Sequence, residues 1–75
     1  METKNEKFTR LANARLVNIL EQLRILNNLS NTSNYDYDET QISELFKIME
    51  KNVRSSKRLF AEGLEKLTIK KAEGK

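Results

Sequence analysis

The second half of the chain carries an uninterrupted 3-4 repeat of apolar and small side chains. The repeat comprises Ile42, Phe46, Met49, Val53, Ser56, Phe60, Gly63 and Leu67. Alternating steps of four and three residues keep one side of an α-helix turned toward a partner for about seven turns, as in helical bundles and coiled coils. The pattern therefore predicts an all-α protein whose second helix packs along its whole length.

Two helices and a short polar linker account for the chain. We expect a first helix at about residues 5–29, a linker at 30–37, a second helix at about 38–67 and a frayed tail at 68–75. The sequence contains no proline and only two glycines, a composition that favours long helices. The short linker predicts that the helices are antiparallel neighbours, so that residues 1–75 form a single helical-hairpin domain.

The first helix has more apolar surface than one partner helix can cover. Its apolar positions extend over roughly 180°, whereas a single partner covers little more than about 100°. A chain of 75 residues also buries only a modest share of its surface as a monomer. We therefore expect the hairpin to self-associate, as a dimer that forms a four-helix bundle or as a higher cyclic assembly. The expected oligomer interface comprises Leu16, Leu20, Leu23, Ile42, Phe46, Met49, Val53 and Phe60.

The start of the second helix is marked by two overlapping signals. Asp38 is a suitable N-cap with Gln41 as its capping-box partner, while Tyr37 and Ile42 occupy the hydrophobic-staple positions. Asp36 offers a competing register without the staple. The sequence therefore favours Asp38 as the N-cap.

Four cations form a row on the second helix, which we call the basic row. They are Lys47, Lys51, Arg54 and Arg58. Steps of four, three and four residues place them within roughly 60° of one another, away from the apolar repeat. Such a row suits the phosphates of a nucleotide or a nucleic acid. The alternative is a solvated face that is neutralised by the neighbouring Glu44, Glu50, Glu62 and Glu65.

Arg15 and Gln22 project within the apolar band of the first helix. A guanidinium in an apolar seam needs a partner, because an unpaired buried charge is costly. One interpretation is a contact between subunits that fixes their register. The other is an arginine that grips a carboxylate or phosphate at an oligomer interface.

Two tyrosines in the linker, Tyr35 and Tyr37, lie among amides and a carboxylate. This composition resembles a recognition loop, in which aromatic area supplies binding energy, and a tyrosine can also stack on a base. The alternative is structural: Tyr37 is the staple residue, Tyr35 covers the end of the hairpin, and the asparagines cap the first helix.

Composition narrows the classes of function. Cysteine and histidine are both absent, which removes disulfides and the commonest zinc ligands. No nucleophile–base pair, metal-ligand set or glycine-rich phosphate loop is visible, so we expect no enzyme, no cofactor and no bound metal. The apolar runs are too short for a membrane span and no signal-peptide pattern follows Met1, so we expect a cytoplasmic protein without a membrane partner.

Four short segments resemble a group of small helical-hairpin proteins from bacterial chromosomes, plasmids and prophages. They are Arg-Leu-Ala (10–12), Asn-Leu-Ser-Asn (28–31), Ser-Asn-Tyr-Asp-Tyr (33–37) and Gln-Ile-Ser-Glu-Leu-Phe (41–46). The chain departs from that pattern at Asp38, where threonine is frequent and would also serve as an N-cap. The resemblance implies a bacterial or mobile-element origin and assigns no functional residues.

The sequence predicts a non-enzymatic oligomeric binding module. The leading hypothesis is a small regulatory or inhibitory protein of a mobile element that docks a helical or linker surface onto a partner protein. The alternative is an oligomer that binds an anionic nucleotide or nucleic acid through the basic row and Arg15, with Tyr35 or Tyr37 stacked on a base.

Overall fold

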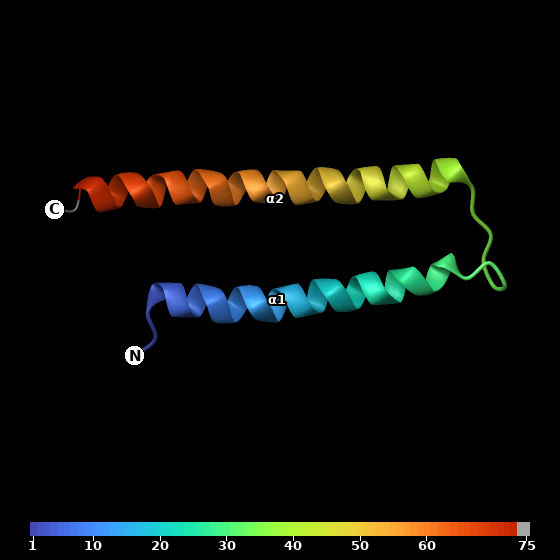
Figure 1. The fold of residues 1–75 in the computed structure, drawn as a ribbon, viewed down its shortest axis with the longest axis horizontal. Helices are drawn as coiled ribbons and strands as arrows, with labels where there is room; N and C mark the ends of the chain where they lie inside the picture. Colours follow the sequence, from blue (N-terminus) through green and yellow to red (C-terminus); the bar gives the residue numbers. More distant parts are fainter. Residues whose placement is uncertain (74–75) are drawn as a thin grey trace. The chain divides into compact units, whose positions relative to one another are not determined.

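A computed structural model describes residues 1–73 of the chain, with side chains through Lys71, and this part is helical with no strand. Helix α1 spans Lys4–Asn27, a 3-10 turn η1 spans Asn28–Ser30, and helix α2 spans Glu39–Glu73 (Figure 1). The all-α prediction is therefore confirmed. The chain divides into two units, Met1–Asp36 and Tyr37–Lys75, and each unit is built around one long helix.

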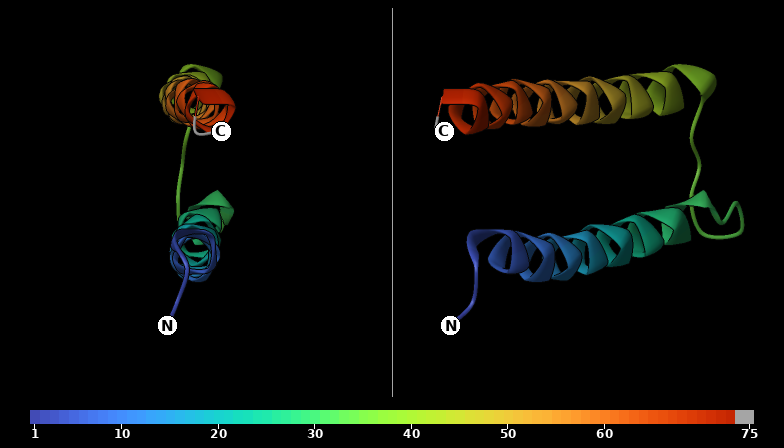
Figure 2. Two further views of the ribbon diagram at one scale, coloured as in Figure 1. Left: turned by 90° about the vertical axis from the view of Figure 1, so that its left-hand side faces the viewer. Right: turned by 60° about the vertical axis from the view of Figure 1, so that its left-hand side comes forward.

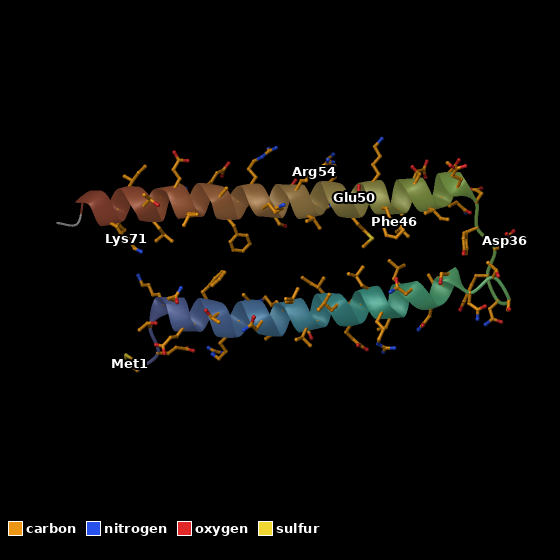
Figure 3. All side chains as sticks on the ribbon, viewed as in Figure 1. Met1, Asp36, Phe46, Glu50, Arg54 and Lys71 are labelled. Carbon is orange, nitrogen blue, oxygen red and sulfur yellow. The ribbon has the colours of Figure 1, made fainter. Side chains whose placement is uncertain are left out.

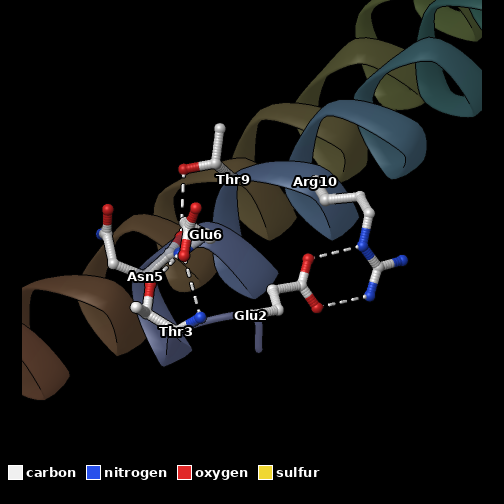
Figure 4. Close-up of polar contacts among 6 residues, drawn as sticks. All are labelled: Glu2, Thr3, Asn5, Glu6, Thr9 and Arg10. Atoms are coloured by element: carbon white, nitrogen blue, oxygen red, sulfur yellow. Dashed lines mark hydrogen bonds and ion pairs between the residues drawn. The ribbon is translucent and has the colours of Figure 1, made fainter.

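Helix α1 begins with a capping box. The Thr3 hydroxyl oxygen accepts a hydrogen bond from the Glu6 backbone N–H at 3.0 Å, and the Glu6 carboxylate accepts one from the Thr3 backbone N–H at 2.9 Å (Figure 4). These two bonds satisfy amide donors that the first turn would leave unpaired. The sequence prediction placed the start near Asn5 and missed this cap, although Thr3 and Glu6 have the spacing of a capping box.

Helix α1 ends two residues before the expected position. The backbone N–H of Asn28 still donates to the carbonyl oxygens of Ile25 and Leu26, and η1 follows directly. The Ser30 hydroxyl then donates to the carbonyl oxygen of Asn27 at 2.7 Å. Short polar side chains that bond to nearby backbone compete with the helical pattern, which explains the change to a tighter turn here.

Helix α2 begins at the cap that the sequence favours. The Gln41 backbone N–H donates to the Asp38 carboxylate at 2.8 Å, and the Asp38 backbone N–H donates to the Gln41 side-chain oxygen at 3.0 Å. The first helical backbone bond runs from the Ile42 N–H to the Asp38 carbonyl oxygen at 3.2 Å. The reciprocal box selects Asp38 over Asp36.

Helix α2 extends to Glu73, whereas a frayed tail was expected from residue 68 (Figures 1 and 2). Residues 68–73 contain neither glycine nor proline, and the Thr68 hydroxyl donates to the Leu64 carbonyl oxygen at 2.9 Å. Lys70 and Lys71 place positive charge in the last turn, where it interacts favourably with the helix dipole. Residues 74–75 of the expected tail lie outside the described part of the chain.

None of the described side chains is buried. The least exposed apolar positions lie on the expected faces of the two helices: Leu11, Ala12, Leu23, Leu26 and Met49 are half-buried. Helices owe most of their stability to packing of an apolar face, and neither unit contains such packing by itself. The antiparallel pairing of the helices and their self-association stay predictions.

Candidate functional site

The apolar repeat forms one continuous stripe along α2, which we call the seam. Phe46 is 44% exposed, Val53 is 59% exposed and Phe60 is 65% exposed, while Ile42 is also exposed and Met49 is half-buried. These residues are the α2 members of the expected oligomer interface. Each of these side chains keeps exposed apolar area.

The α1 members of the expected interface are similarly accessible. Leu16 and Leu20 are exposed, Leu23 is half-buried, and the neighbouring Val17 and Ile19 are more exposed than either leucine. Apolar surface therefore covers more of α1 than a single contact stripe would. The width of this apolar face is the basis for predicting association beyond a lone hairpin.

A shallow hollow lies on the seam in the first half of α2. It is lined by Phe46, Met49, Glu50, Val53, Arg54 and Lys57. Three of these lining residues are apolar and three are charged. Figure 3 shows that Phe46 and Arg54 project from different sides of α2, with Glu50 between them. Lys57 is the member that the sequence analysis missed, although its spacing of seven residues from Glu50 places the two on the same flank.

The basic row has no carboxylate partner in the described part of the chain. Both ion pairs among the described side chains, which extend through Lys71, lie in the first unit. Arg10 Nε is 2.9 Å from the Glu2 carboxylate (Figure 4), and Arg24 pairs with Glu21. The hydrogen bonds that Arg10 and Arg24 donate to the carboxylates of Glu2 and Glu21 raise the pKa of each arginine, and the bond from Arg24 lowers the pKa of Glu21. The neighbouring glutamates form no direct ion pair with the basic row among the described side chains.

Arg15 and Gln22 are exposed on α1, and neither makes a side-chain hydrogen bond within residues 1–73. Neither interpretation of Arg15, a contact with a second subunit or a grip on an anionic ligand, is decided by contacts within the described chain. By their spacing on α1, Arg15 lies beside Leu11 and Gln22 beside Leu26, and both leucines are half-buried.

The linker is organised by Asn31. Its side-chain oxygen accepts a hydrogen bond from the Ser33 backbone N–H at 3.0 Å, and its carbonyl oxygen accepts bonds from the N–H groups of Asn34 and Tyr35 at 3.1 and 3.0 Å. These bonds form an Asx-type turn, a role that the sequence assigned only loosely to the asparagines. Tyr35 is 48% exposed and Tyr37 is 38% exposed. Tyr35 belongs to the first unit and Tyr37 to the second.

Comparison with known proteins adds no family to this geometry. No protein-family model, curated protein or solved structure matches the chain. Neither helix, over residues 1–73, combines the length and apolarity needed to cross a membrane. The described residues also contain no cluster of three or more carboxylates arranged to hold a metal ion. The candidate site is therefore defined by two surfaces of α2, the seam and the basic row.

Proposed function

We propose that this protein is a non-enzymatic, self-associating helical module that docks onto a partner protein. The observation that carries the proposal is that no described side chain is buried while both helices display long apolar faces. The resemblance in the linker supports an origin in a bacterium or mobile element, and within that setting the proposed role is that of a small cytoplasmic regulatory or inhibitory protein. Association supplies the core that a single chain of this size lacks.

The exposed apolar surface is too extensive for a chain that acts alone. Typical monomers expose no apolar patch larger than about 300–600 Å². The seam of α2 spans Ile42 to Leu67, which corresponds to roughly 38 Å of helix at about 1.5 Å per residue. Covering this seam and the broad face of α1 together requires the antiparallel hairpin and at least one further copy.

Oligomeric state tests the proposal directly. We expect sedimentation velocity of the full chain to show a discrete oligomer, and Phe46→Asp to give a monomer that has lost helical circular dichroism. Ile48→Asp is the matched control, because Ile48 is 63% exposed on the same helix but lies outside the seam. A helical monomer in the unmodified chain, or a Phe46→Asp oligomer like the parent, would overturn the proposal.

A second candidate function is binding of a nucleotide or nucleic acid through the basic row. The observation that favours it is the absence of any carboxylate partner for these four cations within residues 1–73. Arg15 and the linker tyrosines are the additional candidates for phosphate contact and base stacking. Like charges at this spacing repel by a few tenths of a kcal/mol, so an anionic partner would relieve a cost that the free helix carries.

Salt dependence distinguishes the two functions. Four phosphate contacts on duplex DNA predict an affinity loss of about 150-fold between about 50 and 200 mM salt, whereas apolar docking changes little. Fluorescence anisotropy with a random-sequence duplex measures this slope, and Lys51→Glu with Arg58→Glu should abolish binding. Binding that is insensitive to salt and to this double change would remove the nucleic-acid candidate.

A further inference from the structure

The seam of α2 has the same spacing in both chain directions. Its steps of 4-3-4-3-4-3-4 residues are symmetric about a point between Arg54 and Ser55. A second α2 can therefore run antiparallel to the first about this point. In that arrangement every seam residue lies opposite a seam residue of the other helix, and each such pair forms one layer of the interface. The four kinds of layer are Ile42 with Leu67, Phe46 with Gly63, Met49 with Phe60, and Val53 with Ser56.

Side-chain volumes favour the antiparallel arrangement over the parallel one. In a parallel, in-register pair, Phe46 would face its own copy and Gly63 would face its own copy, so overfilled layers would alternate with empty ones. Both overpacking and cavities are destabilising. The antiparallel pair places the largest seam residue against the smallest, and a Cβ built on Gly63 meets nothing within 4 Å. There is open space on α2 where the ring of Phe46 would lie.

The hollow on α2 has the form of a socket for a side chain from a facing helix. Four of its lining residues, Phe46, Met49, Glu50 and Val53, have the spacing i, i+3, i+4, i+7. Four residues at this spacing form the hole in knobs-into-holes packing. In the antiparallel register, Phe60 of the second copy lies opposite Met49 and is the side chain that enters this hole.

Charges beside the seam agree with the same register. Glu50 and Lys57 each follow a seam residue directly in the sequence, and both line the hollow. In the antiparallel pair they lie on the same flank, so that Glu50 faces Lys57 of the second copy and the contact occurs twice by symmetry. In a parallel pair the flanking positions would instead bring Glu50 near Leu45 and Lys57 near Asn52.

We propose that α2 pairs antiparallel with α2 of a second copy, with its two-fold axis between Arg54 and Ser55. This inference rests on the proposed self-association and specifies which surface performs it. The occupant of the hollow is Phe60 of the second copy, and the Glu50–Lys57 contacts fix the direction and register of the pair.

Distances between spin labels test the direction of the pair in the full chain. The chain contains no cysteine, so Ser55→Cys and Ser43→Cys each introduce a single labelling site on exposed α2 positions. Because α2 rises about 1.5 Å per residue, the antiparallel register separates the two Ser43 sites by roughly 35 Å along the axis and the Ser55 sites by only about 2 Å. Similar short distances at both sites would show a parallel pair and overturn the inference.

Sedimentation of the same labelled samples separates the two levels of proposal. A monomer would refute self-association and the register together. An oligomer with long distances between the Ser55 labels would leave self-association standing and show that another surface covers the seam.

Charge exchange tests the register independently. We expect Glu50→Lys and Lys57→Glu each to weaken association about tenfold at low salt, because each converts two attractive contacts to repulsive ones. The double variant should restore association to within about threefold of the parent. Glu62→Lys is the matched control, since it also removes a glutamate four residues from an arginine but lies off the seam. A double variant that stays as weak as the product of its singles would refute the Glu50–Lys57 contact.

Discussion

Replacing Asp38 with alanine should destabilise the protein by about 1.3–2 kcal/mol. The change removes the acceptor that lies 2.8 Å from the Gln41 backbone N–H, and loss of an N-cap acceptor typically costs about 1 kcal/mol. It also removes a negative charge from the N-terminus of α2, where the helix dipole stabilises anions by about 0.3–1 kcal/mol. Asp38→Asn keeps an acceptor and removes only the charge, so it should cost about 0.5 kcal/mol.

Urea unfolding followed by circular dichroism measures these differences. All variants are compared at one protein concentration, because association contributes to apparent stability. Asp36→Ala is the control, because Asp36 offers the competing cap. This substitution should change the free energy of unfolding by less than about 0.5 kcal/mol. An Asp38→Ala protein as stable as the parent, or an Asp36→Ala protein equally destabilised, would refute the assignment of the cap.

Three further outcomes follow from individual contacts. Hydrogen bonds from Thr3 lower the pKa of Glu6 in the folded protein. The stability that the ionised Glu6 carboxylate contributes is therefore complete above the ordinary glutamate pKa of about 4.3. It is lost as the pH falls through the lower folded-state pKa. Thr3→Ala removes the hydroxyl but keeps the backbone N–H, which is the larger cause, so it should raise that pKa only part of the way toward the ordinary range in an NMR titration. An unchanged pKa would contradict the contribution of the Thr3 side chain. Arg24→Gln should likewise raise the pKa of Glu21 toward its ordinary value in the same experiment, since the Arg24 bond is what lowers it. Gly63→Leu should increase the helix propensity of α2 but weaken association at least about tenfold, because the leucine fills the space assigned to Phe46 of the second copy. Tighter association in sedimentation velocity would contradict that packing.

Local signals in the sequence predicted the helices because helices depend on local chemistry. The cap at Asp38 was found from its spacing to Gln41 and the staple residues, and the structure forms both hydrogen bonds of that box. The box at Thr3 and Glu6 has the same kind of spacing and was overlooked beside a charged N-terminus. The end of α2 was placed too early because the seam stops at Leu67, although the residues that follow are competent helix formers.

The candidate site depends on association, which local signals describe only in part. Periodicity identified the seam and the basic row, but the role of Lys57 emerges only from the shape of the hollow it lines with Glu50 and Phe46. Likewise, the pairing of the basic row with nearby glutamates depends on side-chain conformation, and the described structure forms none of those pairs. Contacts between separate helices involve residues distant in sequence or on another chain, so spacing along one helix does not determine them.

The two surfaces of α2 lie on nearly opposite sides of the helix, and this separation makes their functions independently testable. At 100° per residue, the mean direction of the basic row lies roughly 160° from that of the seam. An α2 pair that buries the seam therefore leaves Lys47, Lys51 and Arg58 of both copies on its outside, where phosphates can approach, whereas Arg54 also lines the hollow. Charge reversal at Lys51 and Arg58 should abolish anion binding without changing the oligomer, and reversal at Glu50 should weaken the oligomer without changing the salt slope of binding. Effects on distant sites without shared partners add, so a strong coupling between the two sets would mean that anions bind across the seam itself.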